Sequence, residues 1–180
     1  MSGRFLSEDN KQKIRQRRRQ RRIVVSTMTQ WIIGLAVAAV ILLNLFTHVL
    51  QIVRYNGRGM EPNLHSGQML LLQKTQDVGE GDIIAFYYNN QILVRRVICP
   101  GGKQINFNAD GTVLVDGEEQ EESYLQEKSV GQYNIELPHY VPNNCYFVMG
   151  DNRAVAMDSR LKEIGPVPRD RIIGKVLLAL

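Results

Sequence analysis

The sequence QINFNADGTVLVDG, residues 104–117, indicates the fold class most directly. It contains two short β-type runs, 104–108 and 112–117, separated by the pair Asp110-Gly111. A second pair, Asp116-Gly117, ends the second run. Asp-Gly pairs next to β-branched residues are strong signals for β-hairpins, because both residues tolerate the positive φ that tight turns require. The stretch therefore predicts antiparallel strands.

Similar runs extend outward from this hairpin, and turn residues (Gly, Pro, Asn and Asp) separate them. They lie at residues 68–73, 82–88, 92–98, 145–150 and 171–180. No long helical periodicity interrupts them. We expect residues 54–180 to form one mainly β domain, a folded antiparallel sheet or open barrel, since about 125 residues are enough for one core. The acidic, polar segment 118–134 is interpreted as a solvated surface loop.

An apolar stretch precedes this domain. Residues 31–50, WIIGLAVAAVILLNLFTHVL, have no formally charged side chain, and as a helix they would span about 30 Å, the thickness of a bilayer core. A cleaved secretory signal is the competing interpretation. The length of the run favours an uncleaved anchor, and its Ala-x-Ala pattern (Ala36, Ala38) lies near the start of the run, where cleavage is not expected. We place one transmembrane helix at residues 31–53.

The net charge of +4 conceals an uneven distribution. Residues 1–30 contain nine of the 22 Lys and Arg residues and two of the 18 acidic ones, a net charge of +7, which leaves −3 for the remainder. A basic flank before an anchor is typical of a cytoplasmic side that contacts anionic lipid, so the domain is expected outside the membrane. A nucleic-acid-binding arm is disfavoured, because no aromatic residues interleave with the basic ones.

Composition excludes several other classes. Apolar residues make up 44% and charged residues 22%, which argues against a disordered or fibrous chain. Two cysteines, Cys99 and Cys145, are too few for a disulfide scaffold or a four-cysteine zinc site. We interpret them as buried small hydrophobic residues, while a disulfide between them stays open. No cofactor or metal is expected.

Four ordered motifs resemble the type I signal peptidases, serine peptidase family S26. They are GMEPNL (59–64), GDIIAF (81–86), VRRVI (94–98) with Pro100-Gly101, and GDNRAVAMDSR (150–160). The resemblance covers roughly residues 55–180 behind an N-terminal anchor. It implies a β-rich peptidase domain on the outer membrane face that cuts signal peptides with a Ser-Lys dyad.

The chemical positions of that family differ here. The resemblance places the nucleophilic Ser at Gly59, the general-base Lys at Arg95 and a supporting hydroxyl at Ala156. Glycine has no nucleophilic atom, and arginine keeps its proton and cannot act as the base. The Gly59 N–H, which the family pattern directs at the scissile carbonyl, remains able to hold a peptide. The resemblance therefore predicts a member without an intact catalytic set.

The scaffold of the motifs is retained. The resemblance implies peptide-binding or structural roles for Met60, Pro62, Arg96, Asp151, Asp158 and Arg160, with an ion pair between Arg96 and Asp151. A buried cation at Arg95 would be costly, so we expect it to be paired with Asp158 or Glu61, or solvated.

Other residues offer little rescue of catalysis. His65 and Ser66 are adjacent but do not occupy the family's chemical positions, and Ser159 belongs to the structural Asp-Ser-Arg element. His139 is interpreted as a loop histidine and His48 as a residue at the outer end of the anchor.

The resemblance suggests an inactive, membrane-anchored protein that binds secreted polypeptides by strand addition. Inactive relatives are associated with pilus assembly beside sortases in Gram-positive bacteria, which makes pilin subunits and a sortase the expected partners. The alternative is an active signal peptidase I, a serine-type endopeptidase, with an unrecognised catalytic set. A third hypothesis is a structural membrane protein whose basic tail is the working part.

Overall fold

The structure, a computed structural model, describes the backbone of residues 8–180 and the side chains of Arg15, residues 25–44 and residues 46–180. Most of the basic tail therefore lies outside the described side chains. The chain divides into two compact units, residues 1–46 and 47–180.

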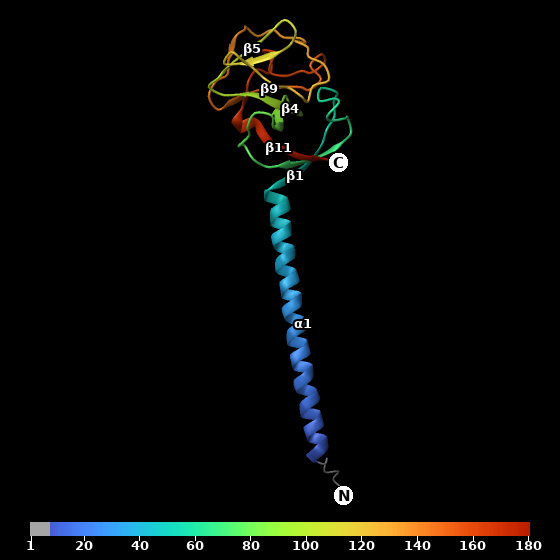
Figure 1. Cartoon of the computed structure of the whole chain (residues 1–180). Helices are drawn as coiled ribbons and strands as arrows, with labels where there is room; N and C mark the ends of the chain where they lie inside the picture. Colours follow the sequence, from blue (N-terminus) through green and yellow to red (C-terminus); the bar gives the residue numbers. More distant parts are fainter. Residues whose placement is uncertain (1–7) are drawn as a thin grey trace. The chain divides into compact units, whose positions relative to one another are not determined.

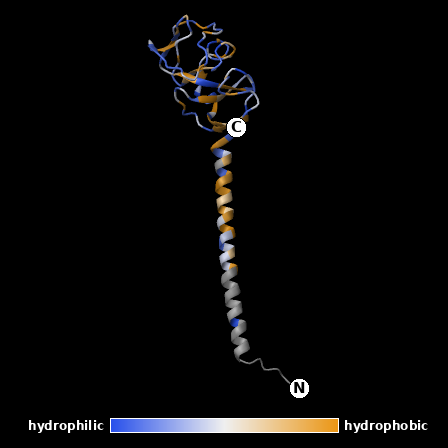
Figure 2. Ribbon diagram, turned by 45° about the vertical axis from the view of Figure 1, so that its right-hand side comes forward, coloured by the Kyte–Doolittle hydropathy of each residue, from blue (hydrophilic) through white to orange (hydrophobic). Residues whose placement is uncertain are grey.

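The first unit is helical. Helix α1 spans Glu8–His48, and Figure 1 labels it. Its segment Val25–His48 has 24 residues and contains an 18-residue window with a mean hydropathy of 2.0, so it is long and apolar enough to cross a bilayer. Figure 2 shows the apolar residues of this segment in orange. Large side chains such as Trp31, Leu35 and Leu43 are exposed along it, which is compatible with burial in lipid.

The end of the helix differs from the sequence-based boundary. The sequence predicts an anchor at residues 31–53, but α1 ends at His48 and strand β1 covers Leu50–Arg54. β1 pairs antiparallel with β2, from Leu50 opposite Gln73 to Arg54 opposite Met69. Apolar residues recur through Val53, with Gln51 between them, so hydropathy alone does not mark the change from helix to strand.

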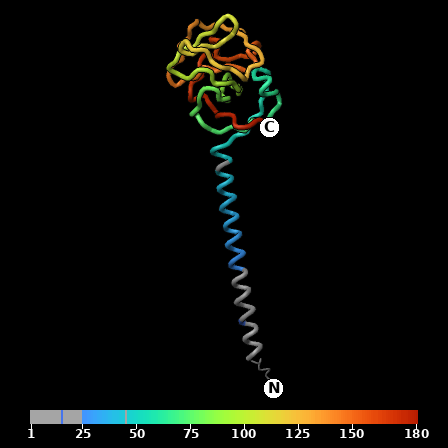
Figure 3. Tube along the Cα trace, in the orientation of Figure 1, coloured from blue at the N-terminus to red at the C-terminus, as the bar shows by residue number. Residues whose placement is uncertain are grey.

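The second unit is built from two antiparallel sheets. The larger has the strand order β1-β2-β11-β3-β4-β9-β10 and the smaller β7-β6-β5-β8. After β1 the elements are β2 (Met69–Gln73), β3 (Ile83–Tyr88), β4 (Gln91–Pro100), β5 (Gln104–Phe107), β6 (Val113–Val115), β7 (Glu118–Glu119), β8 (His139–Tyr140), β9 (Cys145–Met149), β10 (Val167–Pro168), the 3-10 helix η1 (Arg169–Arg171) and β11 (Ile172–Ala179). The C-terminal strand, red in Figure 3, pairs with β2 and β3 from the first half of the chain. The predicted mainly antiparallel fold is confirmed.

The hairpin predicted from residues 104–117 is present. β5 pairs with β6, with Ile105 opposite Val115. Gly111 in the turn has φ +89°, and the next turn, from β6 to β7, has Asp116 at φ 50° and Gly117 at φ +86°. Both Asp-Gly pairs therefore supply the positive φ that the turns need.

The segment 118–134 is not simply a solvated loop, which corrects the sequence-based interpretation. Glu118 and Glu119 pair with β6, and Glu122 is 8% exposed. Both terminal nitrogens of Arg153 donate to the Glu122 carboxylate. The Tyr124 hydroxyl also donates to Glu122, at 2.7 Å. The acidic composition concealed one buried acid among several exposed ones.

Three apolar clusters hold the domain together. One lies between the two sheets around Phe147 and Val141, and a second surrounds Phe86 and Val148 on the large sheet. The third packs Tyr55, Met60 and Leu64 against the strands β2, β3 and β4. This third cluster fixes the loop that carries Gly59.

Candidate functional site

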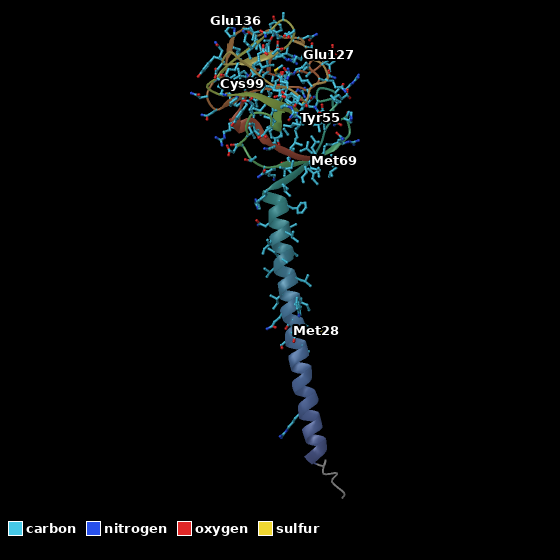
Figure 4. The ribbon with its side chains drawn as sticks, in the orientation of Figure 1. Met28, Tyr55, Met69, Cys99, Glu127 and Glu136 are labelled. Atoms are coloured by element: carbon cyan, nitrogen blue, oxygen red, sulfur yellow. The ribbon has the colours of Figure 1, made fainter. Side chains whose placement is uncertain are left out.

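The loop after β1 positions Gly59. Met60 is fully buried, and its N–H donates to the Tyr55 hydroxyl at 3.1 Å. The Leu64 N–H donates to the Met60 carbonyl at 2.9 Å, which closes a helical turn around Pro62. Tyr55, labelled in Figure 4, is itself buried, and burial raises the pKa of its hydroxyl. The predicted scaffold residue Met60 thus holds the loop through packing.

Arg95 lies in β4, opposite Ile84 of β3, and is only 6% exposed. Its Nε donates to the Met157 carbonyl at 2.9 Å, and its Nη1 donates to the Val94 carbonyl at 2.6 Å. Burial lowers the pKa of Arg95, and the nearby Asp158 carboxylate opposes that shift. The guanidinium remains charged because its ordinary pKa is so high.

The expectation that Arg95 is either paired with an acid or solvated is wrong. Among the described residues no carboxylate oxygen lies within 4.0 Å of its nitrogens. Asp158 instead accepts two hydrogen bonds from Arg160, at 2.8 and 2.7 Å, and Glu61 contacts Arg58 at 3.5 Å. Two main-chain carbonyls accept hydrogen bonds from Nε and Nη1 of the guanidinium without neutralising its charge.

Gly59 packs directly on that guanidinium. A Cβ built on Gly59 would lie 3.2 Å from Cζ, Nη1 and Nη2 of Arg95. The Gly59 carbonyl accepts the N–H of Asn152 at 3.0 Å, which ties the loop to the 150–160 segment. The absence of a side chain at position 59 therefore makes room for the large cation.

Ala156 belongs to the same cluster. Ala156 is buried. A Cβ added at Gly150 would clash with both the Ala156 methyl group and the Gly59 carbonyl oxygen, so the three residues lie close together. The Met157 carbonyl, next along the chain, accepts from Arg95. The structure thus brings together the three positions at which the sequence departs from the resembled chemistry.

Charged pairs surround this cluster. The expected pair is present: Arg96 donates to Asp151 through Nε at 2.9 Å and Nη2 at 2.6 Å. Arg96 also lies over the Tyr124 ring, 4.0 Å from its centroid, and Asn63 donates to Asp151 at 2.8 Å. These contacts connect three separate segments.

Two further contacts complete the scaffold. Asp158 pairs with Arg160, both fully buried, and also accepts the Gly150 N–H at 2.9 Å. The buried pair of Glu122 with Arg153 was missed by sequence reasoning. Nothing in the local sequence marks Glu122, whose partner lies 31 residues away.

A groove of about 430 Å³ runs beside Gly59 and Arg95. It is lined by residues 55–59 of the loop, Tyr88, residues 91–95 of β4, Val155 and Met157. Residues 91–96 of β4 pair with β3 on one edge, whereas β9 pairs only with Arg96–Pro100 on the other. Within the described chain, no strand covers the second edge of residues 91–94.

Comparison with known proteins identifies the family. The model of the family described as signal peptidase, peptidase S26, matches residues 28–180. The chain belongs to this signal peptidase family. It is 31% identical over 169 residues to a signal peptidase IB of Staphylococcus aureus strain Mu50, covering 83% of this chain and 87% of that protein. It is 32% identical over 162 residues to a signal peptidase I of Bacillus licheniformis, covering 83% and 86%.

A solved structure is also similar. A signal peptidase I from Enterococcus faecalis V583 matches with a TM-score of 0.48 and 29% identity, covering 57% of this chain and 97% of that one.

Three further hydroxyls and one lysine of this signal peptidase family member have hydrogen-bond partners of their own. Ser66 is exposed and accepts the Gly57 N–H at 3.3 Å, while Ser159 is buried and accepts the Val148 N–H at 3.0 Å. Lys128 contacts the Thr112 hydroxyl at 3.0 Å, but Thr112 is buried and its hydroxyl donates to Asp110. None of these hydroxyls lines the groove beside Arg95.

The remaining predicted residues have structural surroundings. His139 lies in β8 and packs against Phe147, with ring centroids 5.9 Å apart. Cys99 and Cys145 are free thiols, and Cys99 is fully buried. In the described part of the chain, no group of three or more His, Cys, Asp or Glu side chains is arranged to hold a metal ion.

Proposed function

We propose that this member of the signal peptidase family binds secreted polypeptides at the outer membrane face without cutting them. The observation that carries the proposal is the contact between Gly59 and Arg95. A Ser-Lys mechanism needs a hydroxyl nucleophile and an amine that can lose its proton. The groove offers a residue without a side chain beside a permanent cation, so covalent catalysis has neither component.

The groove retains features that suit an extended peptide. The uncovered edge of β4 at residues 91–94 presents backbone groups for strand addition, and this mode of binding needs no nucleophile. Apolar side chains adjoin that edge, among them Val155 at 60% and Met157 at 55% exposed. They offer contact area for the side chains of a bound polypeptide.

Location and role follow from the first unit of the chain. The apolar segment Val25–His48 would anchor the protein, and the basic residues before it favour a cytoplasmic N-terminus. In this orientation residues 54–180 face translocated proteins. The resulting role is a chaperone or scaffold for secreted subunits, with pilin subunits and a sortase as partners in a Gram-positive cell.

An active signal peptidase I is the second candidate, favoured by the names of the relatives. It would require a nucleophile and base other than the residues at positions 59 and 95. The described residues that line the groove include no Ser, Thr, Cys, Lys or His, so we place binding ahead of cleavage.

Binding is tested with the full-length chain in detergent micelles and an uncharged, acetylated and amidated octapeptide of Ala and Leu. We expect saturable binding that the double variant Val155→Ser/Met157→Ser weakens by about tenfold, because two exposed apolar contacts are lost. The matched control is Tyr140→Ser, which removes a 57% exposed apolar residue of β8. No binding, or equal weakening by the control, would contradict the proposal.

A further inference from the structure

The Arg95 guanidinium has an unused donor that reaches the groove. Nε and Nη1 donate to main-chain carbonyls, whereas Nη2 has no acceptor among the described residues. Every buried side-chain nitrogen or oxygen atom of those residues has a hydrogen-bond partner, so Nη2 must retain some surface. Arg95 lines the groove, which gives a ligand an approach to its guanidinium.

A second unused donor lies beside it. The Gly59 carbonyl accepts from Asn152 and the following N–H, of Met60, donates to Tyr55. The Gly59 N–H itself donates to no acceptor in the described part of the chain. Gly59 also lines the groove, and a Cβ built on it would lie 3.2 Å from the guanidinium.

Arg95 likewise has no ion-pair partner among the described residues. The two acids that act on its charge are engaged, Asp158 by Arg160 and Asp151 by Arg96. A buried cation held only by carbonyl dipoles gains most from an anion supplied by a ligand, because the low local dielectric strengthens their attraction. Guanidinium and backbone N–H groups are both strong donors to a carboxylate.

We propose that the groove contains a carboxylate subsite, formed by Arg95 Nη2 and the Gly59 N–H, that holds a carboxylate of the bound polypeptide. This inference rests on the proposed function, since the same groove binds the chain that brings the carboxylate. The carboxylate comes either from the C-terminus of the peptide or from an Asp or Glu side chain within it. Arg95 thus acts as a recognition residue at the position where an active family member would hold its base.

The test compares three octapeptides of Ala and Leu, all acetylated, on the full-length chain at pH 7. The first ends in a carboxamide, the second in a free carboxylate, and the third is a carboxamide with Glu at its last position. We expect the second or the third to bind at least about tenfold more tightly than the first, as a hydrogen-bonded charge requires. Which of the two gains affinity identifies the source of the carboxylate.

Two variants assign the gain to Arg95. Arg95→Gln removes the charge but keeps a donor for a carbonyl, and it should abolish the preference for a carboxylate. The matched control Arg171→Gln removes one exposed cation from η1 and should preserve the preference. Loss of the preference in both variants would indicate a general effect of net charge and overturn the subsite.

The outcomes separate this proposal from the proposed function. Equal affinity of the wild-type chain for all three peptides overturns the subsite while binding itself stands. Binding of carboxylate peptides alone supports the subsite and contradicts binding through the strand edge. The comparison on the wild-type chain needs no variant, so it decides the matter even if Arg95→Gln fails to fold.

Discussion

The Arg95 guanidinium occupies the space next to Gly59 that a side chain at position 59 would need. The position of a Cβ at Gly59 is 3.2 Å from Cζ and from both terminal nitrogens, which is tighter than ordinary van der Waals contact. The two residues therefore fit each other: a side chain at 59 would press on the cation, and a smaller residue at 95 would leave a space. The changes at the two positions act as one structural unit.

Stability should report this coupling. Gly59→Ala should lower the free energy of unfolding by about 1–3 kcal/mol in the wild-type background, because the methyl group overpacks against the guanidinium. In an Arg95→Lys background the same change should cost less, giving a coupling energy of about 0.5–3 kcal/mol in a double-mutant cycle followed by chemical denaturation.

The control for this cycle is Gly79→Ala. A Cβ there meets no atom within 4 Å, so its effect should be the same in both backgrounds. If Gly59→Ala lowered the free energy of unfolding equally in the wild-type and the Arg95→Lys backgrounds, the packing of Arg95 against position 59 would not be a constraint.

The turn glycines offer a second test. Gly111 and Gly117 have similar φ values, +89° and +86°, but a Cβ on Gly111 would lie 2.6 Å from the Ser129 nitrogen whereas one on Gly117 meets nothing. Gly117→Ala should cost about 1–2 kcal/mol for the left-handed backbone. Gly111→Ala should cost clearly more, since it must also displace the main chain at Ser129. Thermal unfolding checks the order, and equal losses would refute the contact.

The buried pair of Glu122 with Arg153 should dominate the stability of the 118–134 segment. Both side chains are almost completely buried, so Glu122→Gln leaves an uncompensated cation and should cost about 3–5 kcal/mol. The neighbouring exposed Glu121→Gln should change stability by less than about 0.5 kcal/mol. Chemical denaturation of both variants measures the difference, and a mild effect of Glu122→Gln would show that the segment is solvated after all.

The two thiols should differ in reactivity. Burial raises the pKa of Cys99 to about 12. Only the thiolate is nucleophilic, so almost none of the Cys99 thiol is in its reactive form at pH 8. The rate of Cys99 alkylation should rise with pH until about pH 12. The partly exposed Cys145 should be alkylated first. Mass spectrometry after iodoacetamide treatment, with Cys145→Ser as the single-thiol reference, measures this. Rapid modification of Cys99 in the folded protein at pH 8 would contradict its burial.

The fold was largely predictable because its signals are local. Asp-Gly pairs and short β-type runs predicted seven of the strands at nearly their observed bounds. The strand Leu50–Arg54 was not predicted because its apolar residues follow closely on those of the helix, and its assignment depends on pairing with β2. Two-residue strands such as Val167–Pro168 carry no pattern of their own and exist only through their partners.

The sequence indicated which residues lie together in the candidate site, but it did not indicate how their charges are paired. The motifs named Gly59, Arg95 and Ala156, and the structure brings them together. Sequence could not show that Arg160 would occupy Asp158 and leave Arg95 to two carbonyls, because that depends on a competition between two arginines for one acid. The burial of Glu122 was not predicted either, because its partner is distant in the sequence.

Restoration of the family's chemical groups gives the sharper form of the functional test. Gly59→Ser alone should stay inactive, because its Cβ meets the Arg95 guanidinium and no base is present. The triple variant Gly59→Ser/Arg95→Lys/Ala156→Ser should cut a preprotein after an Ala-x-Ala site if only the catalytic set was missing. An inactive triple variant would show that the groove has diverged as well.

The most direct measurement is the intact mass of a secretory preprotein with an Ala-x-Ala site after incubation with the full-length wild-type chain in lipid vesicles. We expect the preprotein to co-purify with the vesicles at its full mass, with no product at any incubation time. A fragment that corresponds to clean cleavage after the Ala-x-Ala site, and that vesicles without the chain do not yield, would contradict it.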